Sequence, residues 1–121
     1  HGIIPRMTSS VFIADAELVE KAYAAGVLEI TEHKVLKGRI VSGDQFVSSV
    51  EKKSFLVETF EAFTTEMEGA AIAHVATMNQ VPFVIIRAMS DKADGSAHVS
   101  FDEFAVEAAH HSSKMVFNML K

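Results

Sequence analysis

Apolar residues follow two different periods along this chain, and the two periods alternate. In residues 15–26 they recur every three or four positions, which is typical of one face of a helix. Asp15 is a good N-cap for this helix, and Gly26 stands where a helix commonly stops. Residues 35–42 are instead rich in side chains branched at the β-carbon, which favour a strand. The chain is therefore predicted to begin with a helix followed by a strand.

The same alternation continues through the middle of the chain. Ser48 and Glu51 form a capping box that predicts a helix over residues 48–60. A short stretch of threonine and phenylalanine at residues 62–66 is predicted to form a strand. Alanines then line a predicted helix over residues 68–79, and their small side chains would let this helix pack close to a sheet.

A long apolar segment, PFVIIRAM at residues 82–89, has almost no polar alternation. Such a segment predicts a central parallel strand that is covered on both faces. Arg87 is its one polar interruption. Because a buried guanidinium needs a carboxylate or a ligand, we expect Arg87 to pair with Glu66 or Glu68.

A second capping box, Ser100 with Glu103, opens the last predicted helix, which carries one apolar stripe. Three helix–strand pairs followed by a helix predict an α/β fold. We expect a three-layer α/β/α arrangement around a mostly parallel sheet, in one domain over residues 1–121. Ligands of such sheets bind beyond the carboxyl ends of the strands. One crevice is expected to collect the three polar stretches that follow strand ends, which are residues 43–46, 66–68 and 90–91.

The composition of the chain argues against several classes of binding partner. The net charge is −5 and lysine and arginine form no cluster, so a nucleic-acid-binding surface is not expected. No apolar run approaches the ~20 residues that cross a bilayer, so we expect no membrane partner. The absence of cysteine fits a reducing compartment, and we expect a cytoplasmic protein. The six histidines show no zinc-like spacing, and adjacent His110 and His111 would face different sides of a helix, so no metal is expected.

The residues at these strand ends also have purely structural interpretations. Glu66 and Glu68 lie near a helix N-terminus, where the helix dipole favours acids by roughly 0.3–1 kcal/mol. Ser90 and Asp91 could cap the loop that follows them. Three nearby apolar residues would by default belong to the core, namely Phe46, Met67 and Phe101. A functional site is favoured by the coincidence of three independent strand ends that offer polar or aromatic side chains to one place.

Three segments carry a resemblance to a known family. They are TTEMEGAAIAHV at residues 64–75, VPFVIIRAMSDKADGSAHVSFDEF at residues 81–104 and VSGDQF at residues 41–46. Together they strongly resemble the 5′-methylthioadenosine/S-adenosylhomocysteine nucleosidases of the purine nucleoside phosphorylase superfamily. The resemblance covers essentially the whole chain, but only the C-terminal half of the family fold. It implies hydrolysis of the N-glycosidic bond of both nucleosides in methionine salvage, with release of adenine and a thioribose.

The matched motifs imply roles for individual residues. Asp91 resembles the general acid that protonates the leaving purine, and Ser90 the residue that holds the base and orients Asp91. The resemblance makes Glu68 the residue that binds the ribose hydroxyls, with Glu66 and Arg87 in supporting roles. It further implies four contacts with the substrate: Phe46 stacked on adenine, the backbone of Val47 at the Watson–Crick edge, Met67 against the sugar and Phe101 in the 5′-thio pocket.

The resemblance also implies what this chain lacks. In the family, the glutamate that activates the attacking water belongs to the N-terminal half, and this sequence has no substitute for it. We therefore expect the chain to need that half. No cofactor is implied. A homodimer is implied, with residues 3–8 expected to complete the 5′ pocket of the neighbouring subunit. Two alternatives stay open, a phosphate-dependent nucleoside phosphorylase of the same superfamily and a catalytically silent nucleoside-binding module.

Overall fold

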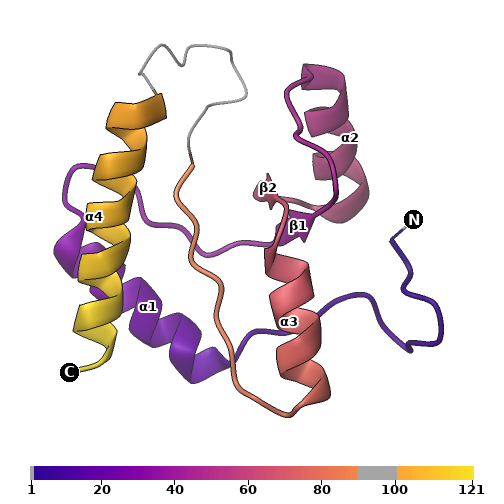
Figure 1. Ribbon diagram of the computed structural model, residues 1–121, viewed down its shortest axis with the longest axis horizontal. Coiled ribbons are helices and arrows are strands. Elements are labelled where there is room, and N and C mark those ends of the chain that lie inside the picture. The colour runs from indigo at the N-terminus through magenta and orange to yellow at the C-terminus, as the bar shows by residue number, and fades with distance from the viewer. Residues whose placement is uncertain (1, 90–100) are drawn as a thin grey trace.

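The computed structural model describes residues 2–89 and 101–121, without the side chain of Phe101. Its elements in chain order are α1 (Ala16–Glu29), β1 (Ile40–Ser42), α2 (Val50–Phe60), β2 (Thr64–Glu66), α3 (Gly69–Met78) and α4 (Phe101–Met119). Helices α1 and α4 pack side by side, whereas α3 packs against β1, and in Figure 1 an extended segment over residues 81–89 runs between these two groups. Among the described residues, no helix is long and apolar enough to cross a membrane.

The two strands pair in parallel, and α2 connects them. The register joins Ile40 to Thr64 and Ser42 to Glu66, so the two carboxyl ends lie side by side. One further backbone hydrogen bond, from the Gly43 N–H to the Glu66 carbonyl oxygen at 3.1 Å, continues the pairing beyond β1. A strand–helix–strand crossover of this kind is the unit from which parallel α/β sheets are built. The α/β class predicted from the sequence is confirmed.

Helix α1 begins as predicted but ends later. The Asp15 carboxylate accepts a hydrogen bond from the Leu18 N–H at 2.9 Å, which is the expected N-cap. The helix runs past Gly26 to Glu29, so the predicted stop at Gly26 is wrong. A β-carbon on Gly26 would lie 2.8 Å from a methyl carbon of Val35 and 3.1 Å from the terminal methyl of Met115. The glycine at this position therefore allows two neighbouring side chains to approach the helix.

Both strands are shorter than the sequence predicts, and α2 is capped one residue later. The N-cap is Ser49, whose hydroxyl accepts from the Lys52 N–H at 3.1 Å, and not Ser48. The helix ends where Glu61 adopts a left-handed conformation with φ of 55°. Of residues 35–42, only the last three form β1, and of residues 62–66 only the last three form β2.

The predicted central strand at residues 82–89 is wrong for the described part of the chain. The segment is extended but joins no sheet, because the sheet described here consists of β1 and β2 alone. The carbonyl oxygen of Phe83 instead accepts from the Asp15 N–H at 2.9 Å. A run of apolar residues predicts that a segment is covered by other parts of the protein. A strand also requires neighbouring backbone groups that pair with its N–H and C=O groups. The expected three-layer arrangement is therefore reduced here to a parallel strand pair with its helices.

Little apolar surface is buried by these elements. The buried apolar side chains among the described residues are Ala22, Ala25, Ala73 and Met115. Many large apolar side chains are exposed, and examples are Ile13, Phe46 and Phe117, at 80%, 80% and 70%. Exposed apolar surface on this scale is typical of surfaces that another polypeptide segment covers.

Candidate functional site

A cluster of polar side chains is centred on Glu66, the last residue of β2. Two backbone N–H groups at the start of α3 donate to its carboxylate, Gly69 at 2.7 and 2.9 Å and Glu68 at 3.2 Å. Glu68 occupies the N-cap position of α3 but makes no capping hydrogen bond with its own side chain. Glu66, two residues before the N-cap, therefore caps the helix in its place by accepting from the first N–H groups. A negative charge at this end also interacts favourably with the helix dipole.

Ser42, at the end of β1, joins this cluster from the neighbouring strand. Its hydroxyl donates to the Glu66 carboxylate and accepts from the Ala70 N–H at 2.8 Å. Ser42 and Glu66 are partners in the strand register, which explains why two residues 24 positions apart meet. No motif in the sequence singles out Ser42. Its signal was its place at the end of a predicted strand, next to the Gly43 turn.

Gly69 is required by the close approach of Glu66 to the helix. A β-carbon at this position would lie 2.9 Å from one carboxylate oxygen of Glu66 and 3.1 Å from the carboxyl carbon. Any other residue would push the carboxylate away from the N–H groups that it accepts from. The glycine of the EMEG sequence is thus tied to the position of Glu66.

Arg87 bridges the two glutamates, as the sequence predicted. Its Nε donates to Glu66 at 2.9 Å, one terminal nitrogen also pairs with Glu66, and the same nitrogen lies 2.6 Å from Glu68. The expectation that Arg87 is buried is wrong, because 36% of its side chain is exposed. The segment that contains Arg87 joins no sheet among the described residues, so Arg87 lacks the cover that a central strand would have.

The surroundings of Glu66 keep its carboxylate ionised. Partial burial alone would raise its pKa, but hydrogen bonds from Ser42, Arg87 and the Gly69 and Glu68 N–H groups outweigh that effect and hold the pKa below 4.5. The hydrogen bond to Glu66 in turn raises the pKa of Arg87, with a smaller contribution from Glu68. At neutral pH the cluster therefore holds the ionised carboxylate of Glu66 against the guanidinium of Arg87.

Glu68 differs from Glu66 in being open to solvent. Its side chain is 65% exposed, whereas that of Glu66 is 10% exposed. Arg87 is its one side-chain partner in the part of the chain that the structure describes, and the contact uses one of the two carboxylate oxygens. Glu68 thus combines a restrained position with a free oxygen, which is what a carboxylate needs to accept hydrogen bonds from a ligand.

The remaining predicted site residues are only partly brought together. Phe46 lies in the loop after β1 and is 80% exposed, Met67 is 45% exposed and Val47 is half-buried. Ser90, Asp91 and the side chain of Phe101 lie outside the described residues. The structure therefore joins the first two of the three predicted strand ends, through Ser42, Glu66 and the backbone of Gly43.

Replacing Glu66 with glutamine is expected to lower the free energy of unfolding by about 1.5–3 kcal/mol, the range for hydrogen bonds to a charged group. The amide keeps the shape but removes the charge that Arg87 and the α3 N–H groups interact with. Urea denaturation at neutral pH measures the change. The matched control is Glu61→Gln. Glu61 is 82% exposed and lies 3.4 Å from Arg39, so we expect a change within about 0.5 kcal/mol.

The stabilisation by Glu66 should also depend on pH in a defined direction. Because the pKa of Glu66 is lower in the folded chain than its ordinary value of 4.5, its contribution is complete above pH 4.5 and is lost as the pH falls through the lower, folded value. The difference between the wild-type chain and Glu66→Gln should therefore shrink only in acid. A difference that is already absent at neutral pH would contradict this account of the cluster.

Comparisons with known proteins agree with this geometry. The chain matches the phosphorylase superfamily model over residues 5–121. It is 40% identical over 122 residues to the 5′-methylthioadenosine/S-adenosylhomocysteine nucleosidase of Bacillus pumilus, an alignment that covers 100% of this chain and 52% of that protein. It is 49% identical over 120 residues to the aminodeoxyfutalosine nucleosidase of Helicobacter pylori strain J99, over 98% of this chain and 50% of that protein.

A solved structure gives the same result for the fold. The crystal structure of the Neisseria meningitidis 5′-methylthioadenosine/S-adenosylhomocysteine nucleosidase, in complex with methylthio-immucillin-A, superposes with a TM-score of 0.84 at 43% identity. The match covers 99% of this chain and 52% of that structure. This chain thus spans about half the length of the nucleosidases that it matches, and it belongs to the phosphorylase superfamily.

Proposed function

We propose that this chain forms the purine- and ribose-binding part of a nucleosidase that hydrolyses the N-glycosidic bond of 5′-methylthioadenosine and S-adenosylhomocysteine. The observation that carries the proposal is the carboxylate of Glu68. It stands exposed at the carboxyl end of a parallel strand, and the Arg87–Glu66 pair restrains it. Ligands of parallel α/β sheets bind at this edge. The family relationship supplies the class of reaction.

Glu68 is assigned to the ribose. Its free carboxylate oxygen accepts hydrogen bonds from the sugar hydroxyls, and its negative charge favours the cationic, oxocarbenium-like sugar that develops as the bond breaks. Glu66 and Arg87 are positioning residues, because their contacts fix the side chain of Glu68 and the start of α3. Met67, which follows Glu66 directly, packs against the sugar in this assignment.

Two groups of residues are assigned to the adenine base. One group follows β1, and the other follows the segment over residues 82–89. Asp91 protonates the leaving adenine, with Ser90 orienting it, because adenine is a poor leaving group until it carries a proton. Phe46 stacks on the base and the backbone of Val47 reads its Watson–Crick edge. The exposure of Phe46 supports this role, since a ring that the fold leaves open is available to a ligand. Phe101 lines the 5′-thio pocket.

The water-activating half of the reaction is assigned to the part of the family fold that this chain does not match. We infer that this chain corresponds to the C-terminal half and that the other half supplies the glutamate that activates water. The exposed apolar surface supports this inference, because such a surface is typically covered by another polypeptide segment. In the assembled enzyme we further propose a cytoplasmic homodimer, with residues 3–8 reaching the 5′ pocket of the neighbouring subunit.

The substrate has a second candidate within the same family. The chain is 49% identical to the aminodeoxyfutalosine nucleosidase of Helicobacter pylori strain J99 and 40% identical to the methylthioadenosine/S-adenosylhomocysteine nucleosidase of Bacillus pumilus. The identity thus favours a nucleosidase that also accepts aminodeoxyfutalosine. Asp91 and Glu68 keep the same assigned roles with either substrate, because both relatives are nucleosidases.

A chimera tests the proposal directly. This chain replaces the matching part of the Bacillus pumilus nucleosidase, and the rest of that protein is kept. We expect the chimera to release adenine from methylthioadenosine, S-adenosylhomocysteine and aminodeoxyfutalosine in buffer without phosphate. The chain by itself should release none, because the glutamate that activates water is assigned to the other half. Chromatography of free adenine measures both, and the unmodified nucleosidase is the control for assay and folding.

The outcomes separate the alternatives. Adenine release that requires phosphate and yields ribose 1-phosphate would replace the hydrolase by a phosphorylase. A folded chimera that binds adenine analogues in calorimetry but releases no adenine would make this chain a silent binding module. Full activity of this chain alone would contradict the division of the site into two halves.

A further inference from the structure

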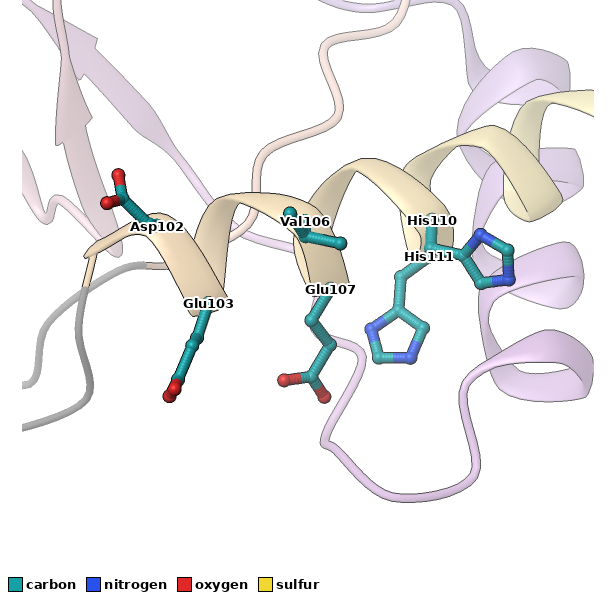
Figure 2. Close-up of a pocket in the computed structure, with 6 residues that line it drawn as sticks. All are labelled: Asp102, Glu103, Val106, Glu107, His110 and His111. Carbon is teal, nitrogen blue, oxygen red and sulfur yellow. The ribbon is translucent and has the colours of Figure 1, made fainter.

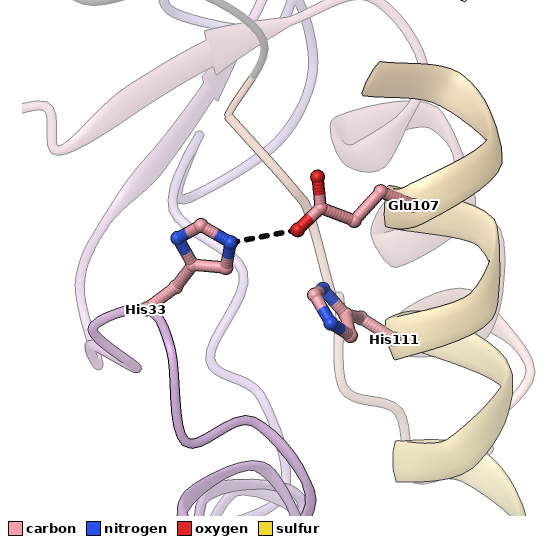
Figure 3. Close-up of side chains that lie close together, drawn as sticks. All are labelled: His33, Glu107 and His111. Atoms are coloured by element: carbon pink, nitrogen blue, oxygen red, sulfur yellow. Dashed lines mark hydrogen bonds and ion pairs between the residues drawn. The ribbon is translucent and has the colours of Figure 1, made fainter. Parts of the chain in front are cut away.

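A second cluster of polar side chains lies where the loop after α1 passes α4. The Nε2 atom of His33 lies 2.9 Å from a carboxylate oxygen of Glu107, and the rings of His33 and His111 meet edge to face with their centroids 5.6 Å apart. Figure 3 shows the three side chains converging from the loop and from one side of the helix. The cluster shares no residue with the one around Glu66, and the assignments above leave it without a role.

The backbone positions of this cluster are set by the best-packed part of the molecule. Glu107 and His111 are four positions apart, so they lie on one face of α4, one above the other. His33 comes from the loop that follows α1, and α1 packs along α4. The buried side chain of Met115 and the hydrogen bond from Asn118 to Glu29 at 3.0 Å hold the two helices together. Both sides of the cluster therefore rest on the same helix pair.

The donor atoms match those of a transition-metal site in type and nearly in spacing. One ligand atom from each of the three residues lies within 4.8 Å of the other two. Tetrahedral zinc, with bonds near 2.0–2.1 Å, places neighbouring ligand atoms about 3.3 Å apart. The side chains of His33 and Glu107 are 57% and 48% exposed, so small rotations are free to close the remaining gap. Two histidines and one glutamate leave the fourth position open for water.

We propose that His33, Glu107 and His111 form a binding site for one divalent transition-metal ion, with Zn²⁺ as the favoured ion. Imidazole ligands suit zinc, nickel, cobalt and copper, whereas calcium and magnesium prefer a shell made of oxygen alone. The ion pair joins His33 to Glu107 and the ring contact joins His33 to His111, whereas one shared ion engages all three side chains. The bound ion joins residues 74 positions apart in the chain, so it clamps the loop after α1 onto α4.

The spacing of the six histidines along the sequence does not reveal this cluster, because His110 and His111 are adjacent there. Figure 2 shows their rings pointing away from one another, with Glu107 on the side of His111. Glu107 and His111 form a helical ligand pair, and the third ligand, His33, lies 74 positions before Glu107 in the chain.

The test uses the full chain without a polyhistidine tag, freed of metal with a chelator and dialysed. Titration with ZnCl₂ in a calorimeter is expected to show one site per chain, and Co²⁺ is expected to give the visible absorption of a tetrahedral complex. His33→Ala and His111→Ala should each weaken zinc binding by at least the ~10- to 100-fold that the loss of a second-shell partner costs. Glu107→Gln should do the same while preserving the shape of the side chain.

The matched control is His110→Ala, which removes an exposed histidine from the neighbouring position of the same helix. It should leave the affinity for zinc unchanged. Zinc should also raise the Tm of the wild-type chain and of His110→Ala, but not that of His33→Ala. The proposal is overturned if no saturable binding is seen, if His33→Ala binds like the wild type, or if His110→Ala weakens binding as much as His111→Ala.

Discussion

Replacing Asp91 with asparagine in the chimera is expected to slow adenine release by roughly 100- to 10,000-fold, the usual contribution of a positioned general acid. Asparagine keeps the size and one acceptor oxygen of aspartate but has no proton to transfer to the purine ring. The bond to adenine then has to break with the base unprotonated. Steady-state kcat for methylthioadenosine measures the loss.

The pH profile and the leaving group separate this role from a structural one. A carboxyl group that delivers a proton near neutral pH must have a raised pKa, so the activity of the parent chimera should fall as the pH rises. Asp91→Asn should remove that dependence. A thioribose derivative with a nitrophenolate leaving group, which departs without protonation, should be far less affected by the substitution.

Asp102→Asn is the control for Asp91→Asn. Asp102 is exposed in the first turn of α4 and has no role in the proposed reaction. The same change of acid to amide there should leave kcat within about twofold, since it removes at most the weak interaction of a surface charge with a helix dipole. A kcat for Asp91→Asn that stays close to that of the parent would show that another group protonates the base.

The elements that the sequence predicts well are those whose signal is local. The Asp15 cap, the helices and the two short strands follow from caps, spacing and branched residues that lie within a few positions of one another. The strand at residues 82–89 fails because it depends on partners elsewhere: its apolar pattern describes a covered segment, and the described residues contain no strand that pairs with it. The predicted helix stop at Gly26 is wrong for a similar reason, because the neighbours of this glycine, Val35 and Met115, are distant in the sequence.

The candidate site divides in the same way. Arg87 was predicted to pair with Glu66 or Glu68 because an apolar strand tolerates a charge only beside an opposite one, and it pairs with both. Ser42 was missed because its contact with Glu66 follows from the register of two strands, which no local pattern reveals. His33 and His111 were missed as neighbours because the packing of α1 on α4 brings them together.

Glu66 and Glu68 of the EMEG sequence differ in exposure, and substitutions of the two are expected to have different effects. Glu68→Gln in the chimera is expected to lower kcat/KM by about 100- to 1,000-fold, the usual cost of one preorganised group that stabilises charge in a transition state. The same substitution should change the free energy of unfolding by less than about 1 kcal/mol, because Glu68 is largely exposed and its ion pair with Arg87 is a surface one. Glu66→Gln is expected to destabilise the fold instead.

The role of Glu68 can be isolated through the substrate. If its carboxylate holds the ribose hydroxyls, a nucleoside that lacks the 2′ and 3′ hydroxyls offers it nothing to bind. Such a substrate should be slow with the parent chimera and should be slowed little further by Glu68→Gln, so the two losses are not additive. Equal losses with the normal and the dideoxy substrate would place Glu68 away from the sugar. Arg87 would then serve to fix the start of α3, and Glu68 would be its second anion.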